Sequence, residues 1–454
     1  MNATRLAVPG SVIRAMRCCV ALVLLLAGAQ AQAGLSFRME VATHNAPGAN
    51  TTGSRPGDDT RTSQVVLGDR HMVVTTAGAS VIYDFASRRR YEIDLKAGTY
   101  VDYSLFDTLG FRTMEVRNRQ NLGRALAAAK LERKVFDPVF DEQSLSVSSD
   151  TQRTLSESAE DADTVLSIDG KALMRIAAGG TPVSAGDAAA FTRFVRYQFG
   201  GHPLVLAKLA ALRRVPSRFV MNYAEAGGAQ TRTFTIAGLA PADAPGYDMG
   251  KYTARGGGAD EIDQLLDRAR TTRWPTQEQS RLRAEGEMSA AFDEKRPLDA
   301  MLGAIELTLV TGAPMTPFPV ERLPMIQADP SVRALLGAMN PQDKAGQSAA
   351  VRVLQSLRPQ TMSKRHMLQL FEANHRAKLG ERAAALELFA SVLRANPALA
   401  GAYKDMGDVL FIGFDMPRAW RSWDQGRRIA PRLNLFEAVD QFEQKLLREY
   451  PEYF

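Results

Sequence analysis

The five histidines of the chain are its first candidates for metal binding or proton transfer, because imidazole serves both roles near neutral pH. They are His44, His71, His202, His366 and His375. None belongs to the helical pattern H-E-x-x-H that holds zinc in a protease. His366 and His375 are nine residues apart, which places them on opposite sides of one helix and argues against a shared metal. His202 precedes Pro203 in a glycine-rich break and is the best single candidate for a role, although a capping or hydrogen-bonding role is the simpler interpretation.

The motifs of nucleophilic and phosphate chemistry are missing from the sequence. It contains no G-x-S-x-G elbow, no serine with a lysine three residues later and no G-x-x-x-x-G-K-[ST] loop. The run Gly256–Gly258 precedes a helical pattern but follows no strand, so it indicates a linker rather than an anion loop. Acidic residues are plentiful, yet no pair stands out as an acid–base dyad. We therefore expect no enzymatic activity, no cofactor and no metal site.

Two charged stretches have other interpretations. A basic stretch, in which Glu132 is the one acid, could guide an anionic head group or partner, or it could be a solvated helix face. Its members are Arg117, Arg119, Arg124, Lys130, Arg133 and Lys134. The acidic stretch from Ser156 to Asp163 is expected to be an exposed loop.

The N-terminus has the pattern of a secretory signal peptide. Three arginines precede an apolar run from Cys18 to Gly28, and two overlapping small-x-small sites follow it. The run is about a dozen residues, short of the roughly 20 that span a bilayer. We expect cleavage after Ala33, which makes residues 1–33 the signal peptide and the mature protein periplasmic or otherwise exported.

Cleavage changes the composition of the mature chain. Both cysteines, Cys18 and Cys19, leave with the signal, which excludes a disulfide framework and a thiolate nucleophile. Three of the 56 Lys and Arg residues leave as well, so 53 remain against 50 acids. This small excess does not predict attraction to nucleic acid. No later segment reaches the length of a transmembrane span.

The elements that must position any site fall into a strand-rich part and a helical part. From Leu35 to about residue 104 the side chains alternate in short runs with close turns, as in an antiparallel meander. Helical patterns follow at 114–135 and 185–214, with further strands at 144–149, 164–168, 172–176, 217–223 and 232–238. From residue 259 the pattern is helical to the C-terminus, apart from a proline-rich break at 314–324. The predicted fold class is α+β, with an N-terminal antiparallel half-barrel-like domain and C-terminal all-α hairpins.

Four markers recur at an offset of 34 residues in the last part of the chain. The pairs are Ala373 with Gly407, Ala385 with Ala419, Phe389 with Trp423, and Pro397 with Pro431. This region resembles the tetratricopeptide repeat (TPR) family, whose period is 34. The resemblance implies helical hairpins whose small residues let the paired helices touch, and a capping helix from Leu433 to Tyr450. Arg376 and Glu372 depart from the family pattern, since they stand where an aromatic and an apolar residue are usual.

In TPR proteins a partner peptide lies along the inner groove of the first helices of each hairpin. Carried over by position, the partner-binding residues would be Met367, Leu370, Asn374, Lys404, Asp408 and Phe411. The competing interpretation is that these residues pack on neighbouring helices.

The N-terminal part carries a weaker resemblance. The pattern G-D-R-x-x-V near Gly68, followed by VIYDF, RRRYEIDL and GTYVDYSL, is similar to envelope proteins related to the LolA/LolB lipoprotein carriers. That family implies a curved antiparallel sheet with helices on its concave side and an apolar ligand within. The predicted organisation is a LolA/LolB-like domain at 34–240, a linker at 241–258, a helical region at 259–360 and TPR-like repeats with a cap at 361–454.

These features predict a non-catalytic exported envelope protein that binds another exported protein through its helical domain. The alternative is a carrier or sensor of an apolar or lipid ligand in the β half-barrel. An enzyme of another type is the third possibility. Neither of the first two functions involves nucleic acid, a cofactor or a transmembrane span after signal cleavage.

Overall fold

The computed structural model describes residues 33–46, 59–130, 137–148, 152–225, 228–243 and 246–454. The predicted signal peptide lies outside these residues, apart from Ala33. The described residues form two compact units, which lie within Met1–Ala77 and Val135–Met249 for the first and within Gly78–Lys134 and Gly250–Phe454 for the second. We refer to them as the sheet unit and the helical unit.

This division differs from the predicted one at residues 78–134, which we had assigned to the N-terminal domain. The structure groups them with the C-terminal helices, because the helix α2 (Leu105–Ala128) packs on α15 (Met416–Ile429) and α16 (Glu437–Glu449). The predicted linker at 241–258 is also partly structured, since a strand of the sheet unit continues to Asp243 and short elements follow at Met249–Lys251 and Thr253–Ala254.

The sheet unit is an antiparallel sheet with the strand order β3-β2-β1-β13-β12-β9-β8-β7, and it is not closed into a barrel. The strands are β1 (Ala33–Asn45), β2 (Asp59–Leu67), β3 (His71–Thr75), β7 (Leu155–Glu160), β8 (Asp163–Ile168), β9 (Lys171–Ile176), β12 (Arg218–Glu225) and β13 (Gly228–Asp243). The strands β10 (Thr181–Pro182) and β11 (Arg214–Val215) form a separate pair. On β1, Phe37 and Met39 are buried while Arg38 and Glu40 are exposed, so one face of the sheet carries the core.

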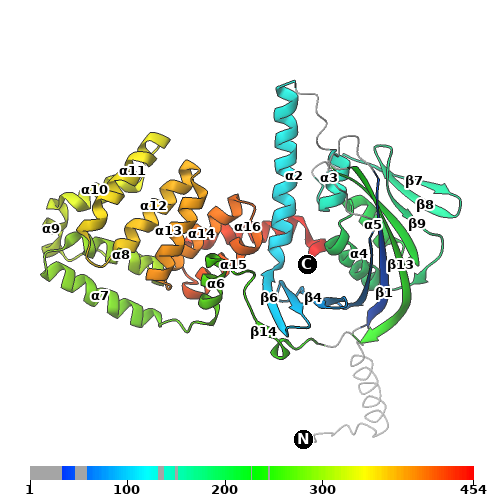
Figure 1. The fold of residues 1–454 in the computed structure, drawn as a ribbon, viewed down its shortest axis with the longest axis horizontal. Coiled ribbons are helices and arrows are strands. Elements are labelled where there is room, and N and C mark those ends of the chain that lie inside the picture. The colour runs from blue at the N-terminus through cyan, green and yellow to red at the C-terminus, as the bar shows by residue number, and fades with distance from the viewer. Residues whose placement is uncertain (1–32, 47–58, 131–136, 149–151, 226–227, 244–245) are drawn as a thin grey trace, which may run out of the picture. The chain divides into compact units, whose positions relative to one another are not determined.

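Three helices lie on that face of the sheet: α3 (Pro138–Leu145), α4 (Ala185–Phe199) and α5 (Pro203–Ala211) (Figure 1). Phenylalanine rings fill the space between them and the strands. Phe37 meets Phe191 and Phe194 of α4 at centroid distances of 5.9 and 5.7 Å, and Phe219 stacks on Phe234 at 4.4 Å. All five rings are at most 1% exposed.

Two predictions in this unit were wrong. The predicted strand at 144–149 overlaps the end of α3, a helix that begins because Asp137 caps the amide of Val139 and Pro138 takes the first helical position. The acidic stretch at 156–163 is not a loop, since its first residues lie on β7, whose side chains after Leu155 are exposed. The sequence of a strand exposed on both faces is rich in charged residues, as the sequence of a loop is, because neither has a buried face.

The helical unit begins with three antiparallel strands, β4 (Ala79–Asp84), β5 (Arg89–Asp94) and β6 (Thr99–Ser104). The short strand β14 (Thr253–Ala254) pairs with β6 in parallel. The helix α2 follows β6 directly and starts nine residues before the predicted helix, because Ser104 caps the amide of Phe106. Of the predicted basic stretch, Arg119 pairs with Glu115 at 2.7 Å, and Arg133 and Lys134 lie outside the described residues.

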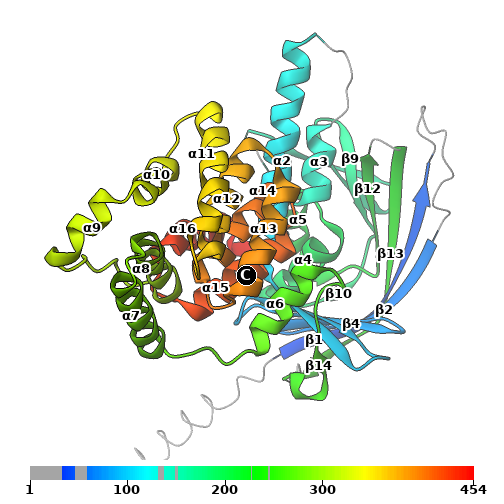
Figure 2. The same ribbon diagram turned by 60° about the vertical axis from the view of Figure 1, so that its left-hand side comes forward.

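The rest of the helical unit is a succession of helices, as predicted. They are α6 (Glu261–Thr271), α7 (Gln277–Asp293), α8 (Pro297–Thr311), α9 (Leu323–Ala328), α10 (Pro330–Met339), α11 (Lys344–Leu357), α12 (Arg365–Leu379), α13 (Arg382–Ala395), α14 (Ala400–Ile412), α15 and α16. Neighbours pack side by side as α7 with α8, α10 with α11, α12 with α13 and α14 with α15 (Figures 1 and 2).

Small side chains let the two helices of a hairpin pack closely, and aromatic side chains fill the space beside them. Ala373, Ala385 and Ala419 are fully buried, and a side chain at Gly407 would collide with the Trp423 indole. Deleting or enlarging such residues is costly because the interior is close-packed. Phe389 is fully buried as well.

Arg376 and Glu372, the two residues that depart from the repeat pattern, form an ion pair with each other. Arg376 donates to Glu372 at 2.9 Å, and Glu372, only 1% exposed, also pairs with Arg358 of the preceding segment. An ion pair therefore occupies the place where aromatic and apolar side chains would otherwise meet.

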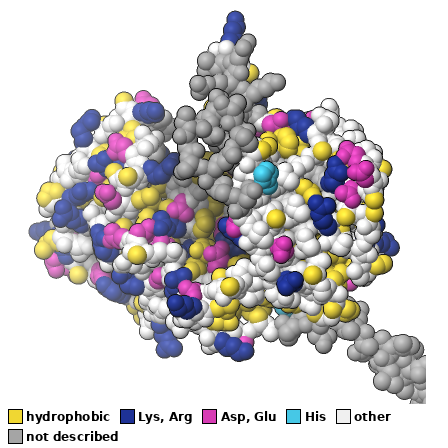
Figure 3. Space-filling view, turned by 45° about the vertical axis from the view of Figure 1, so that its right-hand side comes forward, with side chains coloured by type: hydrophobic (Ala, Val, Ile, Leu, Met, Phe, Trp, Pro, Cys, Tyr) yellow, Lys and Arg dark blue, Asp and Glu magenta, His cyan; other side chains and the backbone are white. Residues whose placement is uncertain are grey.

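Within the described ranges, no helix combines the length and the apolar character that crossing a bilayer requires. On the face that Figure 3 shows, Lys and Arg side chains lie scattered among acidic and polar ones and do not form one continuous basic surface. Such a mixed surface gives little long-range attraction to a polyanion.

Candidate binding site

A hollow of about 550 Å³ opens beside α7 and α8 in the helical unit. Its walls are α7, α8 and the segment 313–319, which we call the proline strap because it contains Pro314, Pro317 and Pro319. The volume falls within the range of about 300–1,000 Å³ that is usual for ligand pockets. We refer to it as the strap groove.

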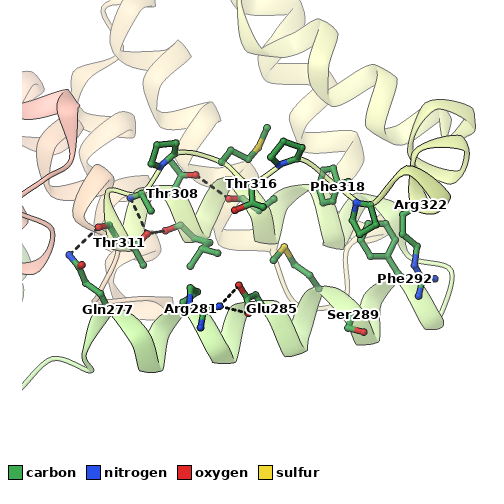
Figure 4. A pocket seen from close by; sticks show the side chains of 18 of the residues that line it. Gln277, Arg281, Glu285, Ser289, Phe292, Thr308, Thr311, Thr316, Phe318 and Arg322 are labelled. Carbon is green, nitrogen blue, oxygen red and sulfur yellow. Dashed lines mark hydrogen bonds and ion pairs between the residues drawn. The ribbon is translucent and has the colours of Figure 1, made fainter.

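The strap leaves α8 at a glycine that the turn requires. Gly312 has a φ of +71°, and a side chain there would collide with the backbone of Leu433. Its amide closes the helix by donating to the Thr308 carbonyl at 2.9 Å. The three prolines then fix φ and remove amide donors, so the strap runs across α7 without secondary structure. Gln277 of α7 donates to the Thr311 carbonyl at 3.2 Å and holds one end of the groove (Figure 4).

The interior surface of the groove is mainly apolar. Met288 and Phe292 come from α7, Leu307 from α8, and Met315 and Phe318 from the strap. Phe318 meets Phe292 edge to face at a centroid distance of 5.5 Å. Met315 is 50% exposed, so the groove presents apolar surface to solvent. Apolar surface that lies open in a hollow of this size makes the groove a candidate binding site.

Charged side chains at the rim are paired with each other. Arg281 lies between Glu278 and Glu285 at 2.6 and 2.7 Å, and it projects from α7 toward the strap (Figure 4). The hydrogen bonds from Arg281 lower the pKa of Glu278. Arg322 pairs with Asp293 at 2.9 Å and lies 5.3 Å from the Phe292 ring centroid. The lining combines apolar walls with paired charges at the rim, an arrangement that suits an apolar group between polar edges.

The six residues predicted to bind a partner lie elsewhere, on α12 and α14. Met367 and Leu370 are 0% and 1% exposed and pack within the helices, so they cannot reach a partner in this structure. Asn374 donates to Asp405 at 2.7 Å, and Lys404 pairs with Asp408 at 2.5 Å.

Phe411, the sixth of these residues, packs on Trp423 and Phe442 at centroid distances of 5.4 and 5.7 Å. The structure thus gives all six residues partners within the chain, in line with the competing interpretation. A role in binding remains a prediction for the four that are not buried.

Asp405, which accepts the hydrogen bond from Asn374, is a weaker acid than a solvated aspartate. Burial raises its pKa to about 6, against the opposing effect of the Asn374 hydrogen bond. Asp405 therefore releases its proton nearer to neutral pH than a solvated aspartate does.

Sequence reasoning missed the polar cluster that joins α8 to α12. Glu306 of α8 accepts hydrogen bonds from Lys364 at 2.7 Å, from His366 at 2.6 Å and from Asn396 at 2.5 Å. Although burial alone would raise it, these bonds lower the pKa of Glu306 to about 2. The cluster holds one wall of the strap groove in place and gives His366 a structural role.

His202 also has a structural environment. Its Nδ1 accepts from the amide of Leu204 at the start of α5, and its Nε2 lies 2.8 Å from Glu142 Oε2. This is the simpler of the two predicted interpretations. In the part of the chain that the structure describes, His, Cys, Asp and Glu form no group suited to a metal ion.

Comparison of the chain with protein-family models and with curated proteins finds no match in either.

Proposed function

We propose that this chain is a non-catalytic exported protein that holds a protein partner, and that apolar side chains of the partner enter the strap groove. The observation that carries this proposal is the open, apolar hollow of about 550 Å³ between α7, α8 and the strap. An open apolar surface favours burial against another molecule by about 25 cal/mol per Å².

The proposal includes membership of the TPR family, which the helical geometry supports. The helices α13 and α15 begin at Arg382 and Met416, 34 residues apart. Pro397 and Pro431 come two residues after the ends of these helices, where a helix cannot continue. Helical repeats of this kind serve as docking platforms. The proposed docking surface differs from the predicted groove, because the residues of that groove are engaged within the chain.

A peptide segment suits the rim of the groove better than a lipid does. The edges carry both signs of charge, with Arg281, Glu278 and Glu285 at one place and Arg322 at another. Mixed polar edges around an apolar centre resemble a protein–protein interface, in which a polar rim surrounds apolar anchors. An acyl chain would use the apolar wall but would make no polar contact with these edges, whereas a peptide can contact both.

The alternative function places an apolar ligand against the concave face of the sheet unit, as the similarity to LolA/LolB carriers implies. The phenylalanine rings of α4, β12 and β13 occupy the region where such a ligand would lie. For this reason we propose the partner-binding function first. Export remains part of the proposal and is supported by the signal pattern of residues 1–33 alone.

A pair of neighbouring substitutions on α7 tests the proposal. Ser289 lines the groove and Ala290 does not, and both are exposed. We expect Ser289→Trp to fill the groove and to abolish binding of a partner purified from the envelope, while Ala290→Trp binds it as the unaltered chain does. Equal binding by both variants would contradict the proposed site. Recovery of the chain from the cytosol alone would contradict export without affecting the groove.

A further inference from the structure

A second hollow in the helical unit is lined largely by arginine. It measures about 240 Å³, and β5, β6, α6, α15 and the segment after β14 contribute to it. Its lining residues include Arg89, Arg255, Arg270, Arg421 and Arg428, together with Asp102 and Asp424. We refer to it as the arginine pocket. Five guanidinium groups lie against the two carboxylates of the lining and the carboxylates of Asp263 and Asp267 that pair with Arg421, which leaves a small local excess of positive charge.

Two of the arginines are fixed by carboxylates. Arg89 pairs with Asp102 at 2.7 Å and with Asp424 at 2.6 Å. Arg421 pairs with Asp263 at 2.6 Å and with Asp267 at 2.9 Å. Such bridges hold the planar guanidinium groups in one orientation, which reduces the entropy lost when a ligand binds.

The other three arginines form no ion pair with a carboxylate of the described residues, although Asp424 acts on Arg428 and Asp267 on Arg270 electrostatically over a longer distance. Arg255 and Arg428 are exposed, and Arg270 lies 5.9 Å from the Tyr100 ring centroid. Arg428 donates to the uncharged oxygens of Ala269 and Gln425. Burial and the charge of Arg270 lower the pKa of Arg428, as expected where like charges crowd together. An anion would relieve this repulsion.

The glycine run Gly256–Gly258, which the sequence indicates is a linker, lies against the ion pairs in the wall of the arginine pocket. A side chain at Gly256 would collide with the Asp267 carboxylate, and one at Gly257 would come within 2.9 Å of Arg421 Nη1. Glycine therefore lets the chain pass this close to the ion pairs without displacing the Asp267 and Arg421 side chains. The amide of Arg255 donates to the Tyr100 carbonyl at 2.8 Å and fixes the approach.

We propose that the arginine pocket binds a phosphate-bearing anion through Arg255, Arg270 and Arg428. Guanidinium groups bind phosphate oxygens through paired, charge-assisted hydrogen bonds, and several converging groups suit a dianion better than a single carboxylate. A volume of about 240 Å³ is roughly eight times that of a liquid water molecule, which is sufficient for a phosphate group. The phosphate could be free or could belong to a lipid head group. This proposal is independent of the strap groove.

The test measures binding of two probes to the full chain. One is inorganic phosphate in solution, and the other is a phosphatidylcholine vesicle with or without phosphatidylglycerol. The variant Arg255→Gln/Arg428→Gln changes two exposed side chains, so it is expected to fold. The control is Arg352→Gln with Arg333→Gln, which removes the same charge from exposed positions on α11 and α10 outside the pocket.

We expect the pocket variant to weaken binding of at least one probe by roughly tenfold or more, and the control to change it much less. Loss of phosphate binding would identify a free phosphate site, and loss confined to the phosphatidylglycerol vesicles would identify a head-group site. The proposal would be overturned if neither probe bound, or if the control weakened binding as much as the pocket variant.

Discussion

The strap groove and the arginine pocket lie in the same helical unit but are built on opposite principles. In the groove the charges pair with each other at the rim and the interior is left apolar. In the pocket the ion pairs belong to the wall, and arginines without a carboxylate partner face the hollow. Each hollow leaves one kind of interaction incomplete, and the ligand chemistry that we propose for it follows from that deficit.

The largest effect expected from this comparison is on stability. Asp263 is 1% exposed and accepts from both Arg418 and Arg421, so Asp263→Asn removes the buried carboxylate that these two guanidinium groups share, while Asp260 and Asp267 remain as their other partners. We expect it to lower the free energy of unfolding of the helical unit by about 3 kcal/mol. Arg281→Gln at the groove rim should leave the denaturant midpoint nearly unchanged, because that ion pair is solvated. Similar losses in both variants would remove the distinction between the two hollows.

Acid should weaken the wall of the groove through Glu306. Its pKa in the folded chain is about 2, below the usual 4.5, so its contribution is complete above pH 4.5 and is lost as the pH falls toward 2. We expect a loss of up to about 3 kcal/mol over this window from this one carboxyl. Denaturant titrations at several pH values should show a smaller dependence in Glu306→Gln. An unchanged dependence in that variant would show that the cluster with Lys364 and His366 does not form.

Asp405 should behave in the opposite way. Because its pKa is raised from 3.8 to about 6, the folded state prefers the neutral carboxyl, and stability is lost as the pH rises through this range. Asp405→Asn keeps an acceptor for Asn374 and should stabilise the chain by about 1 kcal/mol at neutral pH. The effect should disappear at pH 4, as measured by thermal unfolding. A destabilised variant at neutral pH would indicate that Asp405 is ionised in the folded chain and stabilises it in that form.

The smallest expected effect on stability is at the strap. Met315 is 50% exposed, so Met315→Ser should change the free energy of unfolding by no more than about 0.5 kcal/mol. The same variant should weaken binding of the partner, because it removes an apolar side chain from the groove. The matched control is Met362→Ser, since Met362 is 79% exposed and does not line the groove. Equal affinity of the two variants for a purified partner would show that the strap makes no contact with it.

Local patterns predicted most of the elements of this fold. The strands β2 to β6 are short and joined by close turns, and β3 alternates in burial, features that can be recognised in a few residues. The helix α2 was predicted to start too late because its first turn, including Phe106, continues the apolar pattern of β6. Only the cap at Ser104 separates the two elements, and a serine alone does not identify a cap.

Neither hollow could be predicted in the same way, because both depend on long-range contacts. Arg89 and Arg428 are far apart in the sequence and line the same hollow because α15 packs against β6. The strap was recognised only as a proline-rich break after residue 313. Its combination of prolines with Met315 and Phe318, directly after an apolar helix, was the one local signal of the groove.

The most direct test of partner binding is site-specific photocrosslinking from the groove. A photoreactive residue is placed at Ser289 of the full chain in living cells, and a second chain carries it at Ala290 of the same helix. The proposed function predicts a discrete protein adduct from position 289 and none from position 290. Lipid adducts alone at position 289, or the same adducts from both positions, would contradict it.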